Sequence, residues 1–294
     1  MTDIKPPEES DNSDSQIETD KDIQPDYPPP VNKLLTLADA RELVQMPDFY
    51  GMGLRKKHAP DLIRMAIDTD LYDGDRETLA AWAPIHAWRA LAMLDITEAI
   101  EPLIEGVFWW ADEGDEWVIN EMPLVFEHFG PMAIPALVEF LKPHQLNGIT
   151  PRILAILCLR TIGLSYIGMA QGVANIFFRL LRDHHQDYHP LVNSILAVQV
   201  ETIKPSETSD TVETLINKLL ETEEIIPDVL FTGMAIVISE EVFSDEDDID
   251  TDFFEAESPD LKLLSKKPVR RDKKKKRKQV AKSRRVNRKK KRRK

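Results

Sequence analysis

AIEPLIEGVF (residues 99–108) and AIPALVEFLK (133–142) are two versions of one apolar pattern, set 34 residues apart. The pattern returns in GVANIFFRLL (172–181) and TVETLINKLL (211–220), each 39 residues after the previous copy. A weaker copy, HAPDLIRMAI (58–67), precedes the first by 41 residues. Within each copy the apolar residues recur at the spacing of an α-helix. Repetition at this period indicates a stack of similar helical units that bury their apolar faces against one another.

Each strong copy follows another amphipathic segment. These leading segments are IHAWRALAML (85–94), EWVINEMPLVFEHFG (116–130), TPRILAILCLRTIG (150–163) and YHPLVNSILAVQVETI (188–203). Gly130 and Gly163 are predicted to end the second and third of them, because glycine is common just after a helix. Alternating, β-branched strand patterns are scarce, so we expect an all-α protein made of helix pairs.

Composition divides the chain into four parts. Residues 1–30 are acidic and proline-rich and are predicted to be disordered. Residues 31–243 form the predicted helical domain, closed by a capping helix over 223–239. Residues 244–264 are predicted to be an acidic linker. Residues 265–294 are predicted to be a disordered polybasic tail, because long blocks of like charge repel themselves.

The repeats resemble a known family. AIEPLIEGV with AIPALVEFL is most similar to the HEAT-like repeat of phycobilisome lyases. YGMGLRKKHAPDLIRMAID (50–68), WAPIHAWRALAML (82–94) and DEWVINEMPLVFEHFGPMAIPALVEFL (115–141) also resemble uncharacterised bacterial HEAT-repeat proteins. The resemblance is good over residues 45–145 and weak over 146–240. It implies an α-solenoid (armadillo-like) of four to five HEAT-like helix pairs, a fold that hosts many functions. The prediction from the sequence is a protein–protein interaction scaffold.

An enzymatic alternative also follows from the resemblance. HEAT-repeat deoxyhypusine hydroxylases hold two irons with His-Glu pairs, but this chain has no His-Glu dipeptide, and His86 is followed by Ala87. A lyase would use a thiol, and the single cysteine, Cys158, stands in an apolar run where a buried residue is expected. We therefore predict a non-enzymatic protein with no cofactor, and keep a lyase-type or metal-dependent enzyme or accessory as the alternative.

Two histidines are weak metal-ligand candidates. His185 and His189, in DHHQDYHP (183–190), have the i, i+4 spacing that can share a metal on one helix. However, the run joins two predicted helices and Pro190 is expected to start the second. The sequence therefore predicts no metal site.

The candidate protein-interaction residues are aromatic and acidic side chains near the first two strong repeats. They are Trp109, Trp110, Trp117, Glu98, Glu101 and Glu105. Neighbouring residues on a helix differ by 100°, so one of the two adjacent tryptophans should be partly exposed, and exposed tryptophan is common in binding hot spots. The alternatives are that the tryptophans are core residues and that the glutamates only provide solubility.

Charge is segregated along the chain. The net charge is −13, but residues 265–294 contain 20 lysines and arginines and one acid, Asp272, giving +19. The remaining chain has 18 basic and 50 acidic residues, giving −32, and residues 240–260 contain 11 acids and no base. This acidic segment could mask the tail, because the two are tethered close together.

The basic tail is predicted to bind polyanions. It has no aromatic residue, so it can bind a phosphate backbone without recognising bases. Its predicted polyanion-binding residues are Arg270, Arg271, Lys273, Lys274, Lys275, Lys276, Arg277, Lys278, Arg284, Arg285, Arg288, Lys289, Lys290, Lys291, Arg292, Arg293 and Lys294.

The expected partners are therefore an unidentified protein and non-specific nucleic acid, RNA or DNA, with the tail as a tether to nucleic acid or the ribosome. A plain RNA-binding factor with a passive helical body is a further alternative. The longest mostly apolar stretch, residues 225–238, is shorter than the roughly 20 residues of a membrane span and contains Pro227. No membrane association is predicted, and a cytoplasmic location is expected.

Overall fold

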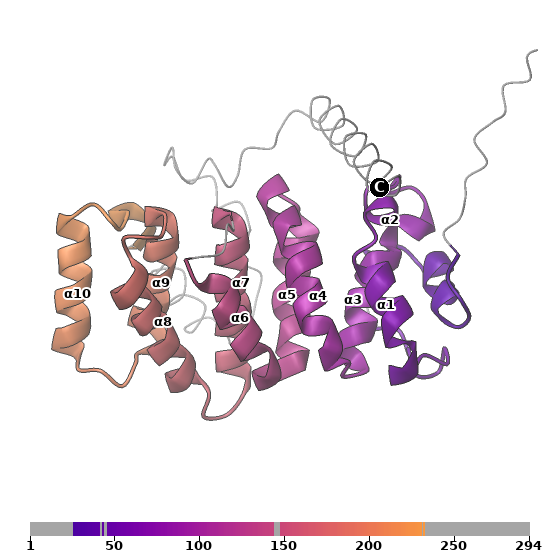
Figure 1. Ribbon diagram of the computed structural model, residues 1–294, viewed down its shortest axis with the longest axis horizontal. Coiled ribbons are helices and arrows are strands. Elements are labelled where there is room, and N and C mark those ends of the chain that lie inside the picture. Colours follow the sequence, from indigo (N-terminus) through magenta and orange to yellow (C-terminus); the bar gives the residue numbers. More distant parts are fainter. Residues whose placement is uncertain (1–25, 42, 44–45, 144–147, 231, 233–294) are drawn as a thin grey trace, which may run out of the picture.

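The computed structural model describes residues 26–41, 43, 46–143, 148–230 and 232. Within these residues the secondary structure is entirely helical, so the predicted all-α class is confirmed. The α-helices stand side by side in a row that runs from α1 at one end to α10 at the other (Figure 1).

The helices are short. The α-helices are α1 (Ala59–Ala66), α2 (Thr69–Tyr72), α3 (Ala83–Met93), α4 (Ile100–Val107), α5 (Glu116–Phe129), α6 (Ile134–Leu141), α7 (Ile149–Ser165), α8 (Ala170–His184), α9 (Pro190–Ile203) and α10 (Ser209–Glu221). The 3-10 helices are η1 (Val31–Thr36), η2 (Lys56–His58), η3 (Leu79–Trp82), η4 (Thr97–Ala99), η5 (Phe108–Glu113) and η6 (Gly130–Ala133).

The repeated pattern in the sequence corresponds to a repeated order of helices. The strong copies lie on α4, α6, α8 and α10, and the weak copy on α1. The four leading segments lie on α3, α5, α7 and α9. Pro102 and Pro135 stand in the first turns of α4 and α6, where the backbone N–H groups have no intrahelical acceptor and proline is tolerated.

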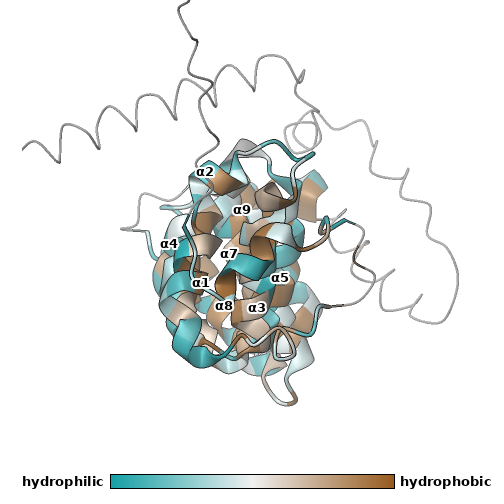
Figure 2. Cartoon of the chain, turned by 90° about the vertical axis from the view of Figure 1, so that its right-hand side faces the viewer, coloured by the Kyte–Doolittle hydropathy of each residue, from teal (hydrophilic) through white to brown (hydrophobic). Residues whose placement is uncertain are grey.

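Packing between the leading helices builds one continuous core. α3 packs on α5, α5 on α7 and α7 on α9, while α1 packs on α3 and α4 on α6. The fully buried residues include Trp88, Phe108, Phe126, Cys158 and Phe177, which belong to successive parts of the row. Figure 2 looks along the row from its α1 end. Hydrophilic residues, in teal, lie at the edge of the body near the label of α4.

A buried ion pair joins α3 to α5. Arg89 Nε donates to Glu121 Oε2 at 2.9 Å, and Arg89 Nη2 donates to the other carboxylate oxygen. Both side chains are about one-tenth exposed. Removing one member of such a pair strands a buried charge, which costs about 3–5 kcal/mol. The α3–α5 contact therefore combines apolar packing with a polar pair that requires Arg89 and Glu121 to face each other.

The folded region starts earlier than the predicted boundary at residue 31. Tyr27 is buried, and its hydroxyl donates to Asp68 Oδ2 at 2.7 Å. The guanidinium of Arg64 lies over the Tyr27 ring, 3.9 Å from its centre. Residues 26–30 thus belong to the helical body, a correction that requires contacts with residues about 40 positions away. Residues 1–25 lie outside the described part of the chain.

Two glycines that look alike in the sequence have different positions. Gly130 follows the last residue of α5, as predicted, with φ 61° and ψ −147°. Gly163 does not end α7, which continues to Ser165, so that prediction is wrong. A Cβ on Gly163 would lie 3.0 Å from Val173 of α8, so the missing side chain lets α7 and α8 approach closely.

One helical stretch, Glu116–Leu141, has the length and apolar composition of a membrane span. It consists of α5 and α6, which are separated by η6 and by the change of backbone direction at Gly130. The predicted capping helix over 223–239 is described only at its start, where residues 227–230 are helical.

Replacing Gly130 with alanine is expected to lower the free energy of unfolding by about 2–3 kcal/mol, because its backbone conformation belongs to glycine alone. The added Cβ would also lie 2.5 Å from the hydroxyl of Tyr166, which donates to Glu127 O. Urea unfolding followed by circular dichroism measures the effect. Gly172→Ala is the matched control: its Cβ meets nothing within 4 Å, and it should leave stability unchanged or raise it by up to about 1 kcal/mol. Equal stabilities for the two variants would contradict the prediction.

Candidate protein-interaction surface

Three glutamates line the outward side of α4. Glu98 lies in η4, and Glu101 and Glu105 follow at spacings of three and four residues, so the three carboxylates share one side of the helix. All three are exposed, whereas Leu103 and Val107 on the opposite side are fully buried. We call these three glutamates the acidic ridge.

The acidic ridge is not neutralised by neighbouring bases through direct contacts. None of its carboxylates makes a hydrogen bond or an ion pair with another residue in the described ranges. Lys56 lies nearby, and its ammonium is bonded to Asp95 Oδ2 at 2.9 Å. That bond raises the pKa of Lys56, with Glu98 adding a smaller effect in the same direction. A cationic ligand would therefore meet three ionised carboxylates in water.

Trp110 is a core residue. It is 3% exposed, and its ring stacks on Tyr72 with 4.1 Å between the ring centres. Trp88 of α3 approaches both rings, 5.5 Å from Tyr72 and 6.1 Å from Trp110. Burial, with Asp115 nearby, raises the pKa of the Tyr72 phenol. Trp110 thus binds η5 to the first helices of the row and is not available to a partner.

Trp109 is the half-buried member of the tryptophan pair, as the 100° step between neighbours predicts. Its indole Nε1–H donates to Gly106 O at 2.8 Å, so its polar atom is already bonded. The residue stands one helical turn beyond Glu105. Trp109 lies in η5, four residues after the last glutamate of the acidic ridge, and is the partly exposed aromatic residue next to it in sequence.

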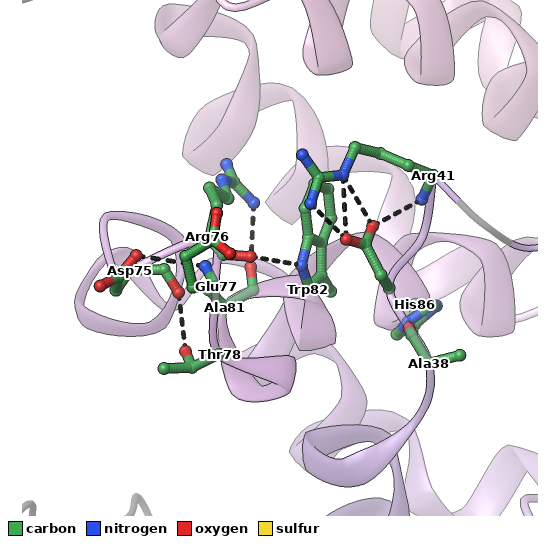
Figure 3. A network of polar contacts seen from close by, with 10 residues as sticks. Ala38, Arg41, Asp75, Arg76, Glu77, Thr78, Ala81, Trp82 and His86 are labelled. Atoms are coloured by element: carbon green, nitrogen blue, oxygen red, sulfur yellow. Dashed lines mark hydrogen bonds and ion pairs between the residues drawn. The ribbon is translucent and has the colours of Figure 1, made fainter.

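Trp117 belongs to a different group of side chains. It is half-buried on α5, and its ring meets Trp82 edge-on at 5.3 Å. Arg41 and Arg76 lie over the Trp82 ring, 4.8 and 4.9 Å from its centre (Figure 3). The three predicted tryptophans are thus divided between two clusters, and sequence spacing does not reveal this.

Arg76 connects the two aromatic clusters, and nothing in the sequence distinguishes it. Its guanidinium lies over Tyr72 as well as Trp82. Its Nη1 donates to Ala81 O at 2.9 Å (Figure 3). The Trp82 indole in turn donates to Arg76 O at 3.0 Å. Arg76 precedes Trp82 by six residues, so its position depends on the turn before η3.

Asp112, near the end of η5, and Asp115, just before α5, have structural roles that their charge alone does not indicate. Asp115 caps α5 by accepting from the backbone N–H groups of Trp117 and Val118. A Cβ on Gly148 would lie 1.9 Å from Asp112 Oδ2, so this carboxylate rests against the backbone at the start of α7. Acidic groups are stabilised at helix N-termini by the helix dipole. Asp112 and Asp115 therefore fix the turn and are not part of an open acidic patch.

His185 and His189 lie between two helices and not on one helical face. α8 ends at His184 and α9 begins at Pro190, so the two histidines lie in the predicted break. His189 is the N-cap of α9, and its Nδ1 accepts from Leu191 N at 3.2 Å. Across the described ranges there is no group of three or more histidine, cysteine, aspartate or glutamate side chains able to hold a metal ion.

The residues considered for catalysis are buried. Cys158 is fully buried, as expected, and burial raises the pKa of its thiol well above the usual value. His86 is also fully buried, and its Nε2 donates to Ala38 O at 2.7 Å (Figure 3). Burial lowers the pKa of His86, so the imidazole is neutral near pH 7. Neither residue presents a reactive group to solvent.

No family model, curated protein or solved structure matches this chain. The predicted polyanion-binding residues, Arg270 to Lys294, lie outside the described part of the chain. The candidate surface therefore consists of the acidic ridge and the exposed part of Trp109.

Replacing Trp110 with alanine is expected to lower the free energy of unfolding by about 3–5 kcal/mol, because it empties a site beside the two buried rings of Tyr72 and Trp88. Trp109→Ala removes a half-buried ring and should cost about 2 kcal/mol or less. Thermal and urea unfolding of the two variants tests the difference. A larger loss for Trp109 than for Trp110 would show that their assignments to core and surface are wrong.

Proposed function

We propose that this protein is a non-enzymatic interaction scaffold with the architecture of a HEAT-like α-solenoid. The proposal rests first on the repetition of helix pairs, in which α3, α5, α7 and α9 pack in succession and each is followed by a second helix. Such stacks offer an extended side surface for binding. The burial of Cys158 and His86 supports a binding role over the lyase-type or metal-dependent alternative.

In this proposal the acidic ridge and Trp109 bind a protein partner with a basic segment. The ridge supplies three exposed carboxylates within two helical turns, and the half-buried indole supplies an apolar contact at its end. Exposed ionised groups favour association through long-range attraction, whereas aromatic anchors supply more of the affinity. The combination favours a lysine- or arginine-rich peptide with one apolar side chain.

The polybasic tail acts as the localising element. Its 20 basic residues and single acid give it the charge of a polyanion-binding arm, while the rest of the chain is acidic. An arm of this composition binds RNA or DNA backbones, including ribosomal RNA, without sequence preference. The protein then works in the cytoplasm, where the tail brings the solenoid and its partner to nucleic acid.

Affinity capture tests the scaffold. Full-length protein and residues 1–264 are used as baits with and without nuclease, next to 1–264 carrying Glu98→Gln, Glu101→Gln and Glu105→Gln. We expect one protein to remain on the 1–264 bait after nuclease treatment and to be reduced at least fivefold by the triple substitution. Asp210→Asn, Glu213→Gln and Glu221→Gln on α10 remove the same charge from exposed positions and serve as the control.

Three outcomes would contradict the scaffold proposal. Loss of every captured protein from 1–264 favours the plain RNA-binding alternative. Equal losses with the α4 and α10 triple substitutions would show that capture depends on net charge and not on the acidic ridge. A visible chromophore or a stoichiometric metal in the purified full-length protein would favour the enzyme alternative.

Salt dependence tests the tail. If the tail neutralises ten phosphates of single-stranded RNA, log Kobs should fall against log salt with a slope of about −7. Fluorescence anisotropy with RNAs of unrelated sequence measures both the slope and the lack of sequence preference. Residues 1–264 should show no measurable binding. A slope near zero, or strong preference for one sequence, would contradict an electrostatic tether.

A further inference from the structure

The helix α10 has a small buried face. α10 buries three side chains, Val212, Ile216 and Leu219, whereas α9 buries eight residues. A helix of 13 residues is marginal in water without packing partners. Its attachment therefore depends strongly on the residues that follow it.

The turn after α10 is held by the junction between α8 and α9. Asn193 Nδ2 donates to His185 O at 2.8 Å and to Glu224 O at 3.0 Å, so one fully buried amide ties the two turns together. Ser194 Oγ, also fully buried, accepts from Ile226 N at 2.8 Å. These three hydrogen bonds involve groups that do not titrate, and they place the side chain of Glu224 beside that of His185.

The imidazole of His185 has one defined tautomer in this position. Its Nδ1 lies 3.1 Å from both Leu181 O and Arg182 O, and because carbonyl oxygens only accept, Nδ1 carries a proton. Its Nε2 therefore faces Glu224 Oε2, 3.4 Å away, with a lone pair when the ring is neutral. Glu224 Oε2 is buried and has no hydrogen-bond donor. Two acceptors thus oppose each other unless Nε2 is protonated.

We propose that His185 and Glu224 form a proton-dependent latch that fastens the turn after α10 to the α8–α9 junction. With Nε2 protonated, an imidazolium faces a carboxylate and the contact is attractive; with Nε2 deprotonated, the attraction is replaced by repulsion between lone pairs. The latch is closed while Nε2 carries its proton and weakens when that proton is lost, and histidine is the side chain that most often exchanges a proton in the physiological pH range.

The other charged groups around the latch have their own contacts. His184 lies 3.6 Å from Asp187, Arg182 is bonded to Asp183 at 2.6 Å, and His189 caps α9. From α7, Arg152 lies over the Tyr188 ring at 5.6 Å, and from the turn itself Glu223 is exposed. Glu224 is the carboxylate that contacts Nε2 of His185, at side-chain exposures of 27% and 13%. This partial burial shields the pair from full solvent screening.

The latch lies close to the end of the described residues, ahead of the acidic and basic segments in the sequence. Ile225 and Leu230 are buried directly after Glu224, and the acidic and basic segments begin at residues 240 and 265. Opening the latch loosens this anchor while the neutral hydrogen bonds of Asn193 and Ser194 remain. The inference is independent of the proposed scaffold function, because it concerns contacts within the chain.

Hydrogen exchange of the full-length protein tests the latch. Protection factors over residues 209–226 are measured by mass spectrometry at pH 5.5 and 7.5 in the presence of EDTA. We expect protection factors at pH 5.5 to be roughly twofold to fivefold greater than at pH 7.5. The effect is modest because solvent partly screens this ion pair. His185→Gln and Glu224→Gln should abolish this difference. His184→Gln changes the neighbouring exposed pair and should preserve it.

Exchange must be measured segment by segment, because His86 makes the stability of the α3 region change with pH in the opposite direction. Burial lowers the pKa of His86, so its unfolded form binds the proton more tightly and acidification destabilises the α3 region. Protection that does not change with pH in the wild type, or that changes equally in His185→Gln, would overturn the latch. If a variant does not fold, the imidazole ¹³C shift of His185 in the wild type decides: its titration must coincide with the change in exchange, and a mismatch overturns the latch.

Discussion

Short helices need neighbours, and this requirement governs the whole molecule. α4 and α6 have eight residues each, about two turns, and helices of this length are not stable alone in water. Their apolar sides are covered by the longer leading helices, which pack in succession along the row. The Arg89–Glu121 pair adds a polar joint to this packing, because either charge alone would be stranded in the interface. Stability is therefore shared between neighbours and is not a property of any one pair.

The helical class and the order of the helices could be predicted from the sequence because both depend on local periodicity. Gly130 shows how far such inference extends: a glycine after an apolar helix correctly predicts its end. Gly163 shows the limit, since it serves the contact between α7 and α8 and the helix continues past it. Tyr27 shows a second limit, because its burial depends on Asp68 and Arg64, and composition alone places it in a disordered segment.

The candidate surface was predicted in part for the same reason. The spacing of Glu98, Glu101 and Glu105 places them on one side of α4, and the 100° step separates Trp109 from Trp110. The division of the tryptophans between two clusters could not be predicted, because Trp82 meets Trp117 through tertiary packing and Arg76 connects the clusters from an irregular turn. The roles of Asp112 and Asp115 were also hidden, because composition does not show that Asp115 caps α5 or that Asp112 lies against the backbone at Gly148.

The hydrogen bonds from Asn193 and Ser194 also determine how the protein carries mechanical load. Tension applied to the C-terminal segments enters the body near Leu230 and reaches Ile226 and Glu224 before it reaches α10. Because these residues are bonded to Asn193 and Ser194 of α9, and Asn193 also bonds His185 O after α8, the force passes into the main row through buried polar contacts. α10 then lies in a loop that bears little of the load. α10 is thus placed in parallel with the force path and not in series with it.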